Sequence, residues 1–319
     1  MIQVQGLTKY YGPVEAVRDV SFEAGTGQVL GFLGPNGAGK TTVMKILTGY
    51  HFPDRGEALI DGISVQDNPL EVKKRIGYLP ESVPLYGDLN PEEYLTFVAA
   101  SRLVPKAERK KTVERALEAC GLMNARNKTV ETLSKGYKQR VGLAQAIIHD
   151  PPILILDEPT SGLDPNQIID IRNLIKELGR SKTVILSTHI LQEVEAVCSQ
   201  VLIINEGIIA AQGSPEEIAA TMKGGDTWEL QLKGKSPAEI EALAALLGEG
   251  LSSVSAKPLD RGITELTFLA AETNDVDGEA VFDWAVSQGL KILAMNRKRL
   301  SLEDIFVKLT GDEGGSHEA

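Results

Sequence analysis

A glycine-rich segment near the N-terminus has the residue types and the spacing that hold phosphate groups. Gly34-Pro35-Asn36-Gly37-Ala38-Gly39-Lys40-Thr41 matches the pattern G-x-x-x-x-G-K-[ST], and Thr42 follows directly. The glycines let backbone N–H groups curl around phosphate oxygens, Lys40 can reach the β- and γ-phosphates, and the Thr41 hydroxyl can ligate Mg²⁺. We therefore expect Gly34–Thr42 to bind a nucleoside triphosphate together with Mg²⁺.

Two acids follow a short apolar run later in the chain. Asp157 and Glu158 come directly after Ile153–Leu156. A buried parallel strand delivers its C-terminal residues to the ligand-binding edge of the sheet. There Asp157 can hold Mg²⁺, usually through water, and Glu158 can act as a general base that polarises the attacking water. Kinases, GTPases and many ATPases share such a pair, so the two motifs leave the class of enzyme open.

The phosphate loop lies between a predicted strand and a predicted helix. The apolar run Val29–Leu33 enters the loop, and Thr42–Thr48 has a helical pattern. Buried strand, glycine loop and helix is the context that a phosphate loop requires. Further along, strands are expected at Ala58–Ile60, Ile76–Leu79, Ile153–Leu156 and Thr183–Ser187, helices at Pro165–Leu178 and Ile190–Val197, and a hairpin over Val201–Ala211. This alternation predicts an α/β fold with a mainly parallel sheet.

A helical block interrupts the alternation at about residues 88–148. Asn90, Pro91 and Glu93 have the spacing of an N-cap, a first-turn proline and a capping-box acid. A second helix is expected from Pro105 to Cys120. We interpret this block as a subdomain inserted into a first domain that spans residues 1–222.

Residues 223–310 predict a small second domain after a linker at Met222–Asp226. The expected elements are strand Thr227–Leu232, helix Ser236–Leu247, strands Ser252–Lys257 and Ile263–Leu269, helix Gly278–Gln288 and strand Lys291–Asn296. This order, βαββαβ, is the ferredoxin-like α+β arrangement. A last helix is expected from Ser301, and the polar tail at residues 311–319 is expected to be disordered.

Composition excludes some classes of protein and some locations. The formal net charge is −11, which argues against a nucleic-acid partner. The chain has two cysteines, Cys120 and Cys198, which favour a reduced compartment over a disulfide framework. The sequence starts without the pattern of a signal peptide and has no run of about 20 apolar residues that would span a bilayer. We expect a soluble, cytoplasmic protein that can dock on a membrane partner.

Three further segments narrow the class of enzyme. They are Leu133-Ser134-Lys135-Gly136-Tyr137-Lys138-Gln139-Arg140, Ser161-Gly162-Leu163-Asp164 and Thr188-His189. In this order, with the phosphate loop and the two acids, they resemble the ATP-binding subunits of ATP-binding cassette (ABC) transporters over about residues 2–222. The chain has no Asn-Lys-x-Asp segment that would select guanine, which argues against a GTPase.

The resemblance implies a role for each matching residue. It implies that Tyr11 stacks on adenine, that Asp157 holds Mg²⁺, that Glu158 is the catalytic glutamate, and that His189 contacts the γ-phosphate and helps to hold the attacking water. It also implies that Ser134 and Gly136 contact the γ-phosphate of ATP bound to the opposite subunit, and that Asp164 lies in the loop that crosses the dimer interface. ATP, Mg²⁺, a second ATPase subunit and a separate multi-spanning permease are the implied ligands and partners.

Two departures from the commonest family pattern point to one branch. Glu81 occupies the position of the Q-loop glutamine, and the signature segment reads Leu-Ser-Lys-Gly-Tyr. With Ser301–Phe306, these segments are similar to ABC-2-type exporter ATPases, including the gliding-motility-like branch. Our hypothesis is that Glu81 performs the task of the glutamine as a Mg²⁺ ligand and catalytic residue, while it adds negative charge beside Asp157 and Glu158.

A second hypothesis is an ABC-type ATPase outside transport, acting as an assembly or regulatory module. The sequence lacks the long coiled coil of chromosome-maintenance relatives and the paired cassettes of translation-factor relatives. Neither absence excludes a soluble partner, so both hypotheses stay open at the level of the sequence.

Overall fold

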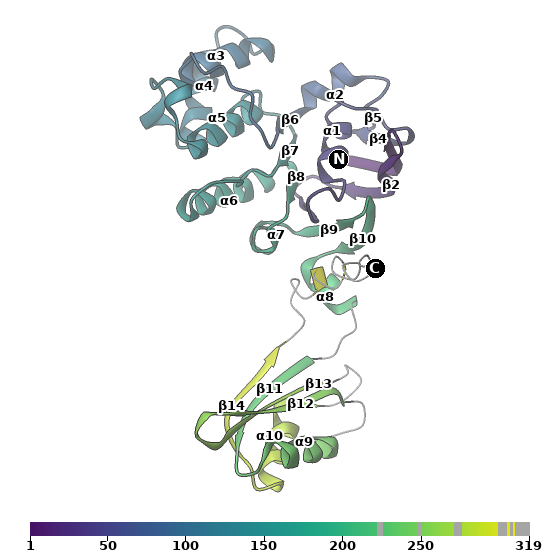
Figure 1. Ribbon diagram of the computed structural model, residues 1–319. Coiled ribbons are helices and arrows are strands. Elements are labelled where there is room, and N and C mark those ends of the chain that lie inside the picture. The colour runs from purple at the N-terminus through teal and green to yellow at the C-terminus, as the bar shows by residue number, and fades with distance from the viewer. Residues whose placement is uncertain (222–225, 248–250, 271–275, 299–304, 307–308, 310–319) are drawn as a thin grey trace. The chain divides into compact units, whose positions relative to one another are not determined.

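The computed structural model divides into two compact units (Figure 1). It describes residues 1–221, 226–247, 251–270, 276–298, 305, 306 and 309. The first unit spans Met1–Pro215 and the second Glu216–Ala319. The division comes before the predicted boundary at 222, because helix α8 (Pro215–Thr221) falls almost wholly in the second unit. Most of the predicted linker, the predicted start of the last helix and the predicted disordered tail lie outside the described residues.

A six-stranded sheet of order β10-β9-β3-β8-β7-β6 forms the centre of the first unit. Its strands are β3 (Val29–Leu33), β6 (Ile76–Leu79), β7 (Ile153–Asp157), β8 (Thr183–Thr188), β9 (Gln200–Asn205) and β10 (Ile208–Gly213). All pairs are parallel except the β9–β10 hairpin, as the sequence predicted. Every residue of β3, β7 and β8 is buried, which explains their unbroken apolar runs. Leu33 pairs with Thr188 and Asp157 with Ser187, so these strands end at one edge of the sheet.

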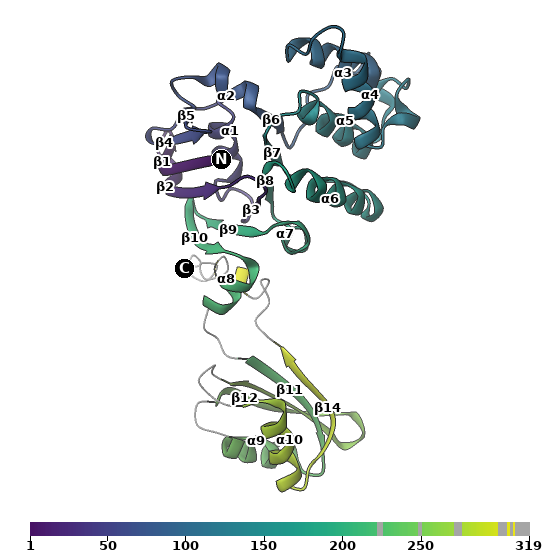
Figure 2. The same ribbon diagram turned by 180° about the vertical axis from the view of Figure 1, so that it is seen from behind.

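Helices lie beside this sheet, and those that follow β3, β7 and β8 begin at its ligand-binding edge (Figures 1 and 2). They are α1 (Lys40–Leu47), α2 (Pro69–Arg75), α6 (Pro165–Gly179) and α7 (Leu191–Val197). Asp164 caps α6 by accepting a hydrogen bond from the Gln167 N–H, and Pro165 occupies the first turn. None of the helices that the structure describes is both long and apolar enough to cross a bilayer.

A second, antiparallel sheet of order β2-β1-β4-β5 was largely missed from the sequence. Its strands are β1 (Ile2–Tyr11), β2 (Val14–Ala24), β4 (Arg55–Ile60) and β5 (Ile63–Ser64), of which only Ala58–Ile60 was predicted. One hydrophobic core joins both sheets and helix α1, and in it the Phe22 and Phe32 rings meet edge to face at 5.1 Å. This sheet therefore shares its core with the helix that follows the phosphate loop.

Three helices form the helical block, namely α3 (Pro91–Ser101), α4 (Arg109–Ala119) and α5 (Lys135–Ile147). The capping box between Asn90 and Glu93 is present as predicted. The predicted start of α4 at Pro105 is wrong. Residues 105–108 form a separate turn, closed by the Glu108 N–H bonding the Pro105 carbonyl, and the helix begins only at Arg109.

The second unit contains a four-stranded antiparallel sheet of order β12-β13-β11-β14. Its elements come in the order that the sequence predicted: β11 (Asp226–Lys233), α9 (Pro237–Ala244), β12 (Leu251–Leu259), β13 (Ile263–Ala270), α10 (Gly278–Ser287) and β14 (Lys291–Lys298). Residues of β13 alternate between buried and half-buried, and Trp228, Phe268 and Trp284 belong to one core. This alternation shows a sheet with one face covered by helices.

Candidate functional site

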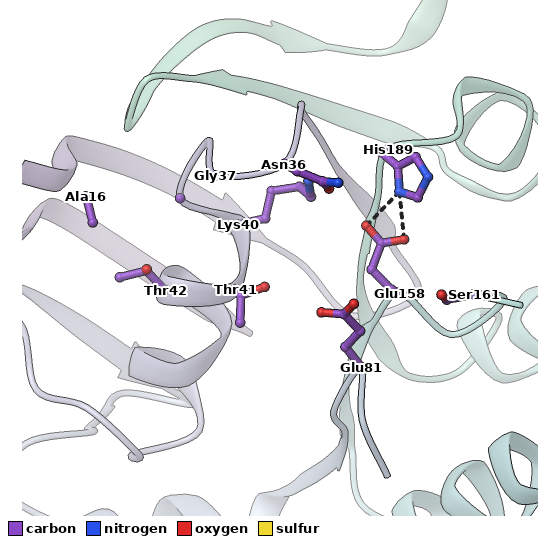
Figure 3. A pocket seen from close by; sticks show the side chains of 11 residues that line it. Ala16, Asn36, Gly37, Lys40, Thr41, Thr42, Glu81, Glu158, Ser161 and His189 are labelled. Atoms are coloured by element: carbon purple, nitrogen blue, oxygen red, sulfur yellow. Dashed lines mark hydrogen bonds and ion pairs between the residues drawn. The ribbon is translucent and has the colours of Figure 1, made fainter.

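A cavity of about 450 Å³ opens in the first unit where the phosphate loop follows β3. Its lining residues are Ala16, Asn36, Gly37, Gly39, Lys40, Thr41, Thr42, Glu81, Glu158, Ser161 and His189 (Figure 3). Most of the residues that we predicted for phosphate binding and catalysis therefore meet in one place. Ala16 and Ser161 are the additions that the prediction lacked.

The phosphate loop has the conformation that its glycines were expected to provide. Gly39 has φ +107°, and a Cβ there would lie 2.6 Å from the Ala16 carbonyl oxygen. A Cβ on Gly34 would lie 2.3 Å from the Ile204 carbonyl oxygen. The loop ends at the N-terminus of α1, whose first turn carries no acid. Free N–H groups and the helix dipole at this point favour an anion.

Lys40 places a cation inside the loop. Its side chain is buried, and Nζ donates to the carbonyls of Gly34 at 2.7 Å and Pro35 at 3.0 Å. Burial lowers the pKa of Lys40, while the nearby acids Glu158 and Asp157 oppose that shift. The loop's own carbonyls thus hold the ammonium group.

Asp157 has one carboxylate oxygen that the described residues leave without a hydrogen bond. The side chain is only 1% exposed, and the Ser187 hydroxyl donates to Oδ1. Oδ2 is buried and has no hydrogen-bond partner among the described residues. Burial raises the pKa of Asp157, and the hydroxyls of Ser187 and Thr41 lower it. A buried oxygen without a partner is costly unless a ligand satisfies it, and a hard cation prefers such oxygens.

Glu158 stands in a strained backbone conformation beside His189. Its φ is +49°, a left-handed value that the surrounding structure must hold in place. The Glu158 N–H donates to the Ser187 carbonyl at 3.1 Å and hydroxyl at 3.2 Å. His189 Nδ1 lies 3.1 Å from Oε1 and 3.0 Å from Oε2 of Glu158 (Figure 3). Burial raises the pKa of Glu158 and His189 opposes the shift, so this carboxylate suits proton acceptance from a bound water.

Eight predicted site residues are not among the lining residues of this cavity. Gly34, Pro35, Ala38 and Asp157 lie within two residues of a lining residue in the sequence, whereas Tyr11, Ser134, Gly136 and Asp164 do not. The Tyr11 ring is exposed and meets the His51 ring edge-on at 5.8 Å. Ser134 caps α5 by accepting from the Tyr137 N–H at 3.4 Å. One chain therefore does not bring the signature segment to its own phosphate loop.

Comparisons with known proteins agree with this geometry. A family model described as ABC transporter matches residues 17–161. The linearmycin resistance ATP-binding protein LnrL of Bacillus subtilis is 30% identical over 98% of this chain and 98% of its own length. The bacitracin transport ATP-binding protein BcrA of Enterococcus faecalis is 31% identical over 98% of this chain and 97% of its own length. The chain belongs to the ABC transporter ATP-binding subunits.

A solved structure shows the state that such a site reaches after reaction. It is the dimeric post-hydrolysis state of the ATP-binding cassette MJ0796 bound to ADP and Pi. It is 25% identical to this chain, with a TM-score of 0.63 over 67% of this chain and 98% of its own. The ABC ATPase described here is accordingly an enzyme that binds and hydrolyses ATP.

The residues present fit the Mg²⁺ ion that was expected from the sequence. The unpartnered Oδ2 of Asp157 and the Thr41 hydroxyl are oxygen donors of the type that Mg²⁺ uses alongside phosphates and water. The described residues contain no group of three or more His, Cys, Asp or Glu side chains that could hold a metal ion by themselves.

Proposed function

We propose that this ABC ATPase is the motor subunit of an ABC-2-type exporter and works with a separate multi-spanning permease on the cytoplasmic face of the cell membrane. The observation that carries the proposal is similarity along almost the whole of BcrA, a protein named for bacitracin transport, and of LnrL, named for linearmycin resistance. Both matches extend through the second unit, beyond the residues that ABC ATPases of every branch share. Glu81 and the Leu133–Tyr137 signature support the same branch.

The proposal includes a dimer that holds two ATP molecules between its subunits. Ser134 and Gly136 lie away from the cavity of their own chain, yet they form the start of α5, whose first turn carries no acid. That helix terminus suits a phosphate group supplied from outside the chain. In the dimer, Ser134 and Gly136 of one subunit face ATP held by Lys40 of the other, and Asp164 lies at the interface.

Within this site, we assign a task to each predicted residue. Gly34–Thr42 binds the phosphates and Tyr11 contacts adenine. Thr41 and Asp157 hold the Mg²⁺ ion, which neutralises phosphate charge when it is bound. Glu158 takes a proton from the attacking water, and His189, which contacts both Glu158 oxygens, orients that carboxylate and the γ-phosphate.

Glu81 adds an acid to this site, and we propose that it is a further Mg²⁺ ligand. Figure 3 shows its carboxylate pointing into the space between Thr41 and Glu158. Burial lowers the pKa of Lys40 and raises that of Asp157; the charge of Glu81 opposes the first shift and adds to the second, so its electrostatic interaction extends across the cavity.

Glu81→Gln should lower the affinity of the site for Mg²⁺ without abolishing hydrolysis. The amide keeps one oxygen but removes a charge worth about tenfold in cation affinity, or about 1.4 kcal/mol. We expect the half-saturating Mg²⁺ concentration of the ATPase reaction to rise by about that factor. An unchanged Mg²⁺ titration and an unchanged rate with the permease bound would show that the acid has no special role.

The helical block offers an aromatic surface next to the Glu81 loop for the permease. Tyr86 packs edge-on against Tyr94 and Phe97, yet Tyr86 is 56% and Phe97 51% exposed. Paired exposed rings are typical of interface anchors. We propose that this surface and the Glu81 loop contact the permease. We also propose that the second unit is a ferredoxin-like accessory domain, on the basis of its βαββαβ order and its sheet order.

Isolation from detergent-solubilised membranes tests the transport proposal. We expect the chain to co-purify with a multi-spanning membrane protein, and a Phe97→Asp, Tyr86→Asp variant to lose that protein while it still hydrolyses ATP. Recovery with soluble partners alone would favour the alternative, an ABC-type ATPase that serves as an assembly or regulatory module.

A further inference from the structure

A buried acid outside the cavity connects the two segments that carry Glu158 and His189. Glu193, in the first turn of α7, is only 1% exposed. The Thr160 hydroxyl donates to its Oε1, and the Thr188 hydroxyl donates to its Oε2 at 2.8 Å. Thr160 stands two residues after Glu158, and Thr188 directly precedes His189. One carboxylate thus anchors both segments.

The surroundings of this carboxylate are closed to solvent. Thr160 is 4% exposed and Thr188 is fully buried. The Thr188 oxygen also accepts the Ile190 N–H at 3.0 Å, which fixes the backbone on the far side of His189. Arg172 of α6 lies 3.9 Å from Oε1 of Glu193 and supplies the only nearby positive charge among the ion pairs of the described residues. A buried acid with two hydroxyl donors and a neighbouring arginine is adequately satisfied.

The strained backbone at Glu158 needs contacts such as those that Glu193 makes with Thr160 and Thr188. A residue at φ +49° keeps that conformation only where neighbouring contacts over-determine it. On one side, Ser187 holds the Glu158 N–H. On the other side, the Glu158 carbonyl accepts the Ser161 N–H at 3.1 Å, and the Thr160 hydroxyl is bound by Glu193. His189, which must meet Glu158 at 3.0 Å, depends on Thr188 in the same way.

We propose that Glu193 is a positioning residue for ATP hydrolysis, which sets the distance between Glu158 and His189 by binding Thr160 and Thr188 together. The inference rests on the proposed roles of Glu158 and His189. Glu193 does not line the cavity, and within the described residues no hydrogen bond or ion pair joins it to Glu158 or His189. It therefore acts on the chemical step and leaves ATP binding unaffected.

Steady-state kinetics of three variants test the proposal. Glu193→Leu removes both acceptors, and we expect kcat to fall about tenfold or more with little change in KM, because a displacement of about 1 Å at a reacting group costs up to about 100-fold. Glu193→Gln restores most of kcat, since its amide oxygen accepts one hydroxyl and its NH₂ group donates to the other. Glu195→Leu, at an exposed position of the same helix, is the matched control and keeps the wild-type kcat.

Two results overturn the inference: a Glu193→Leu kcat equal to that of Glu195→Leu, or a Glu193→Gln loss as large as that of Glu193→Leu. Where Glu193→Leu does not fold, the single variants Thr160→Val and Thr188→Val are the second test, because each deletes one of the two hydrogen bonds and leaves Glu193 its other hydroxyl donor. A lower kcat at constant KM supports the proposal and an unchanged kcat overturns it. Glu158→Gln, measured alongside, distinguishes failure of the Glu158 assignment from failure of the Glu193 proposal. If Glu158→Gln hydrolyses ATP normally, Glu158 is not the base. If Glu158→Gln is inactive and the Glu193 variants have the wild-type kcat, only the Glu193 proposal is wrong.

Discussion

Glu158→Gln should bind ATP normally and hydrolyse it at least about 100-fold more slowly than the wild type, the lower bound of what a general base contributes. The amide keeps the size of the side chain and an oxygen that can face His189 Nδ1, now 3.0 Å from Glu158 Oε2. It cannot take a proton from water. Phosphate release measures the loss, and isothermal titration with ATP checks that binding is retained.

The same variant should collect in the ATP-bound dimer, because closure precedes the step that it blocks. Sedimentation with and without ATP measures this. The control is the double variant Glu158→Gln, Gly136→Asp. The new carboxylate places a negative charge in the signature segment, and its Cβ would lie 2.1 Å from Gln167 Oε1, so the Gln167 side chain must move. We expect a monomer that still binds ATP. Near-normal hydrolysis by Glu158→Gln itself would remove Glu158 from the role of base.

The pH dependence of the wild type provides an independent check on the same residue. Because burial raises the pKa of Glu158, its ionised form is present above that pKa and is lost as the pH falls through it. The wild-type rate should therefore decline on the acidic side at a pH above the ordinary range of a glutamate. The residual activity of Glu158→Gln should lack that decline.

The strands of the central sheet could be predicted because burial on both faces produces a local sequence pattern. Val29–Leu33 and Ile153–Leu156 are buried on both faces, so their apolar runs are unbroken and end at Gly34 and Asp157. The phosphate loop and the two acids stand at those ends. Positions that share one edge of a parallel sheet can thus be placed together from the sequence alone.

The antiparallel sheet could not be predicted in the same way. Its β1–β2 pairing shifts register at several points, and Asp19 has φ +48° within β2. Irregularities of this kind break the two-residue alternation by which a half-buried strand is recognised. Ala16, which this sheet carries into the lining of the cavity, was missed for that reason.

The supporting residues of the site also lay beyond prediction from the sequence. Glu193 and Glu195 are two acids on one short helix, yet the first is buried and the second exposed. Only the tertiary fold, which brings Thr160 and Thr188 to Glu193, distinguishes them. Ser161, unlike Glu193, belongs to a motif recognised in the sequence, Ser161–Asp164. Only its place in the lining of the cavity was not predicted.

Lys40→Met should raise the dissociation constant for ATP by more than about 100-fold. In the proposed site, Lys40 donates to the β- and γ-phosphates of the nucleotide. Each charge-assisted hydrogen bond is worth about 1.5–3 kcal/mol, so two of them exceed that factor. Methionine keeps the length and apolar character of the buried side chain. Isothermal titration measures the change, and Lys45→Met, a lysine on the same helix, is the control.

Lys40→Met should lower the affinity for ATP without lowering the thermal stability of the protein. The ammonium group is buried, and within the described residues its hydrogen bonds go to the Gly34 and Pro35 carbonyls, so its removal also removes a desolvation cost. The unfolding temperature should therefore stay close to that of Lys45→Met. ATP affinity equal to the control would contradict the assignment. Lys40→Met is blocked before the dimer closes, whereas Glu158→Gln is blocked after closure. ATP should therefore produce a dimer of Glu158→Gln but not of Lys40→Met, and this difference distinguishes ATP binding from hydrolysis within one site.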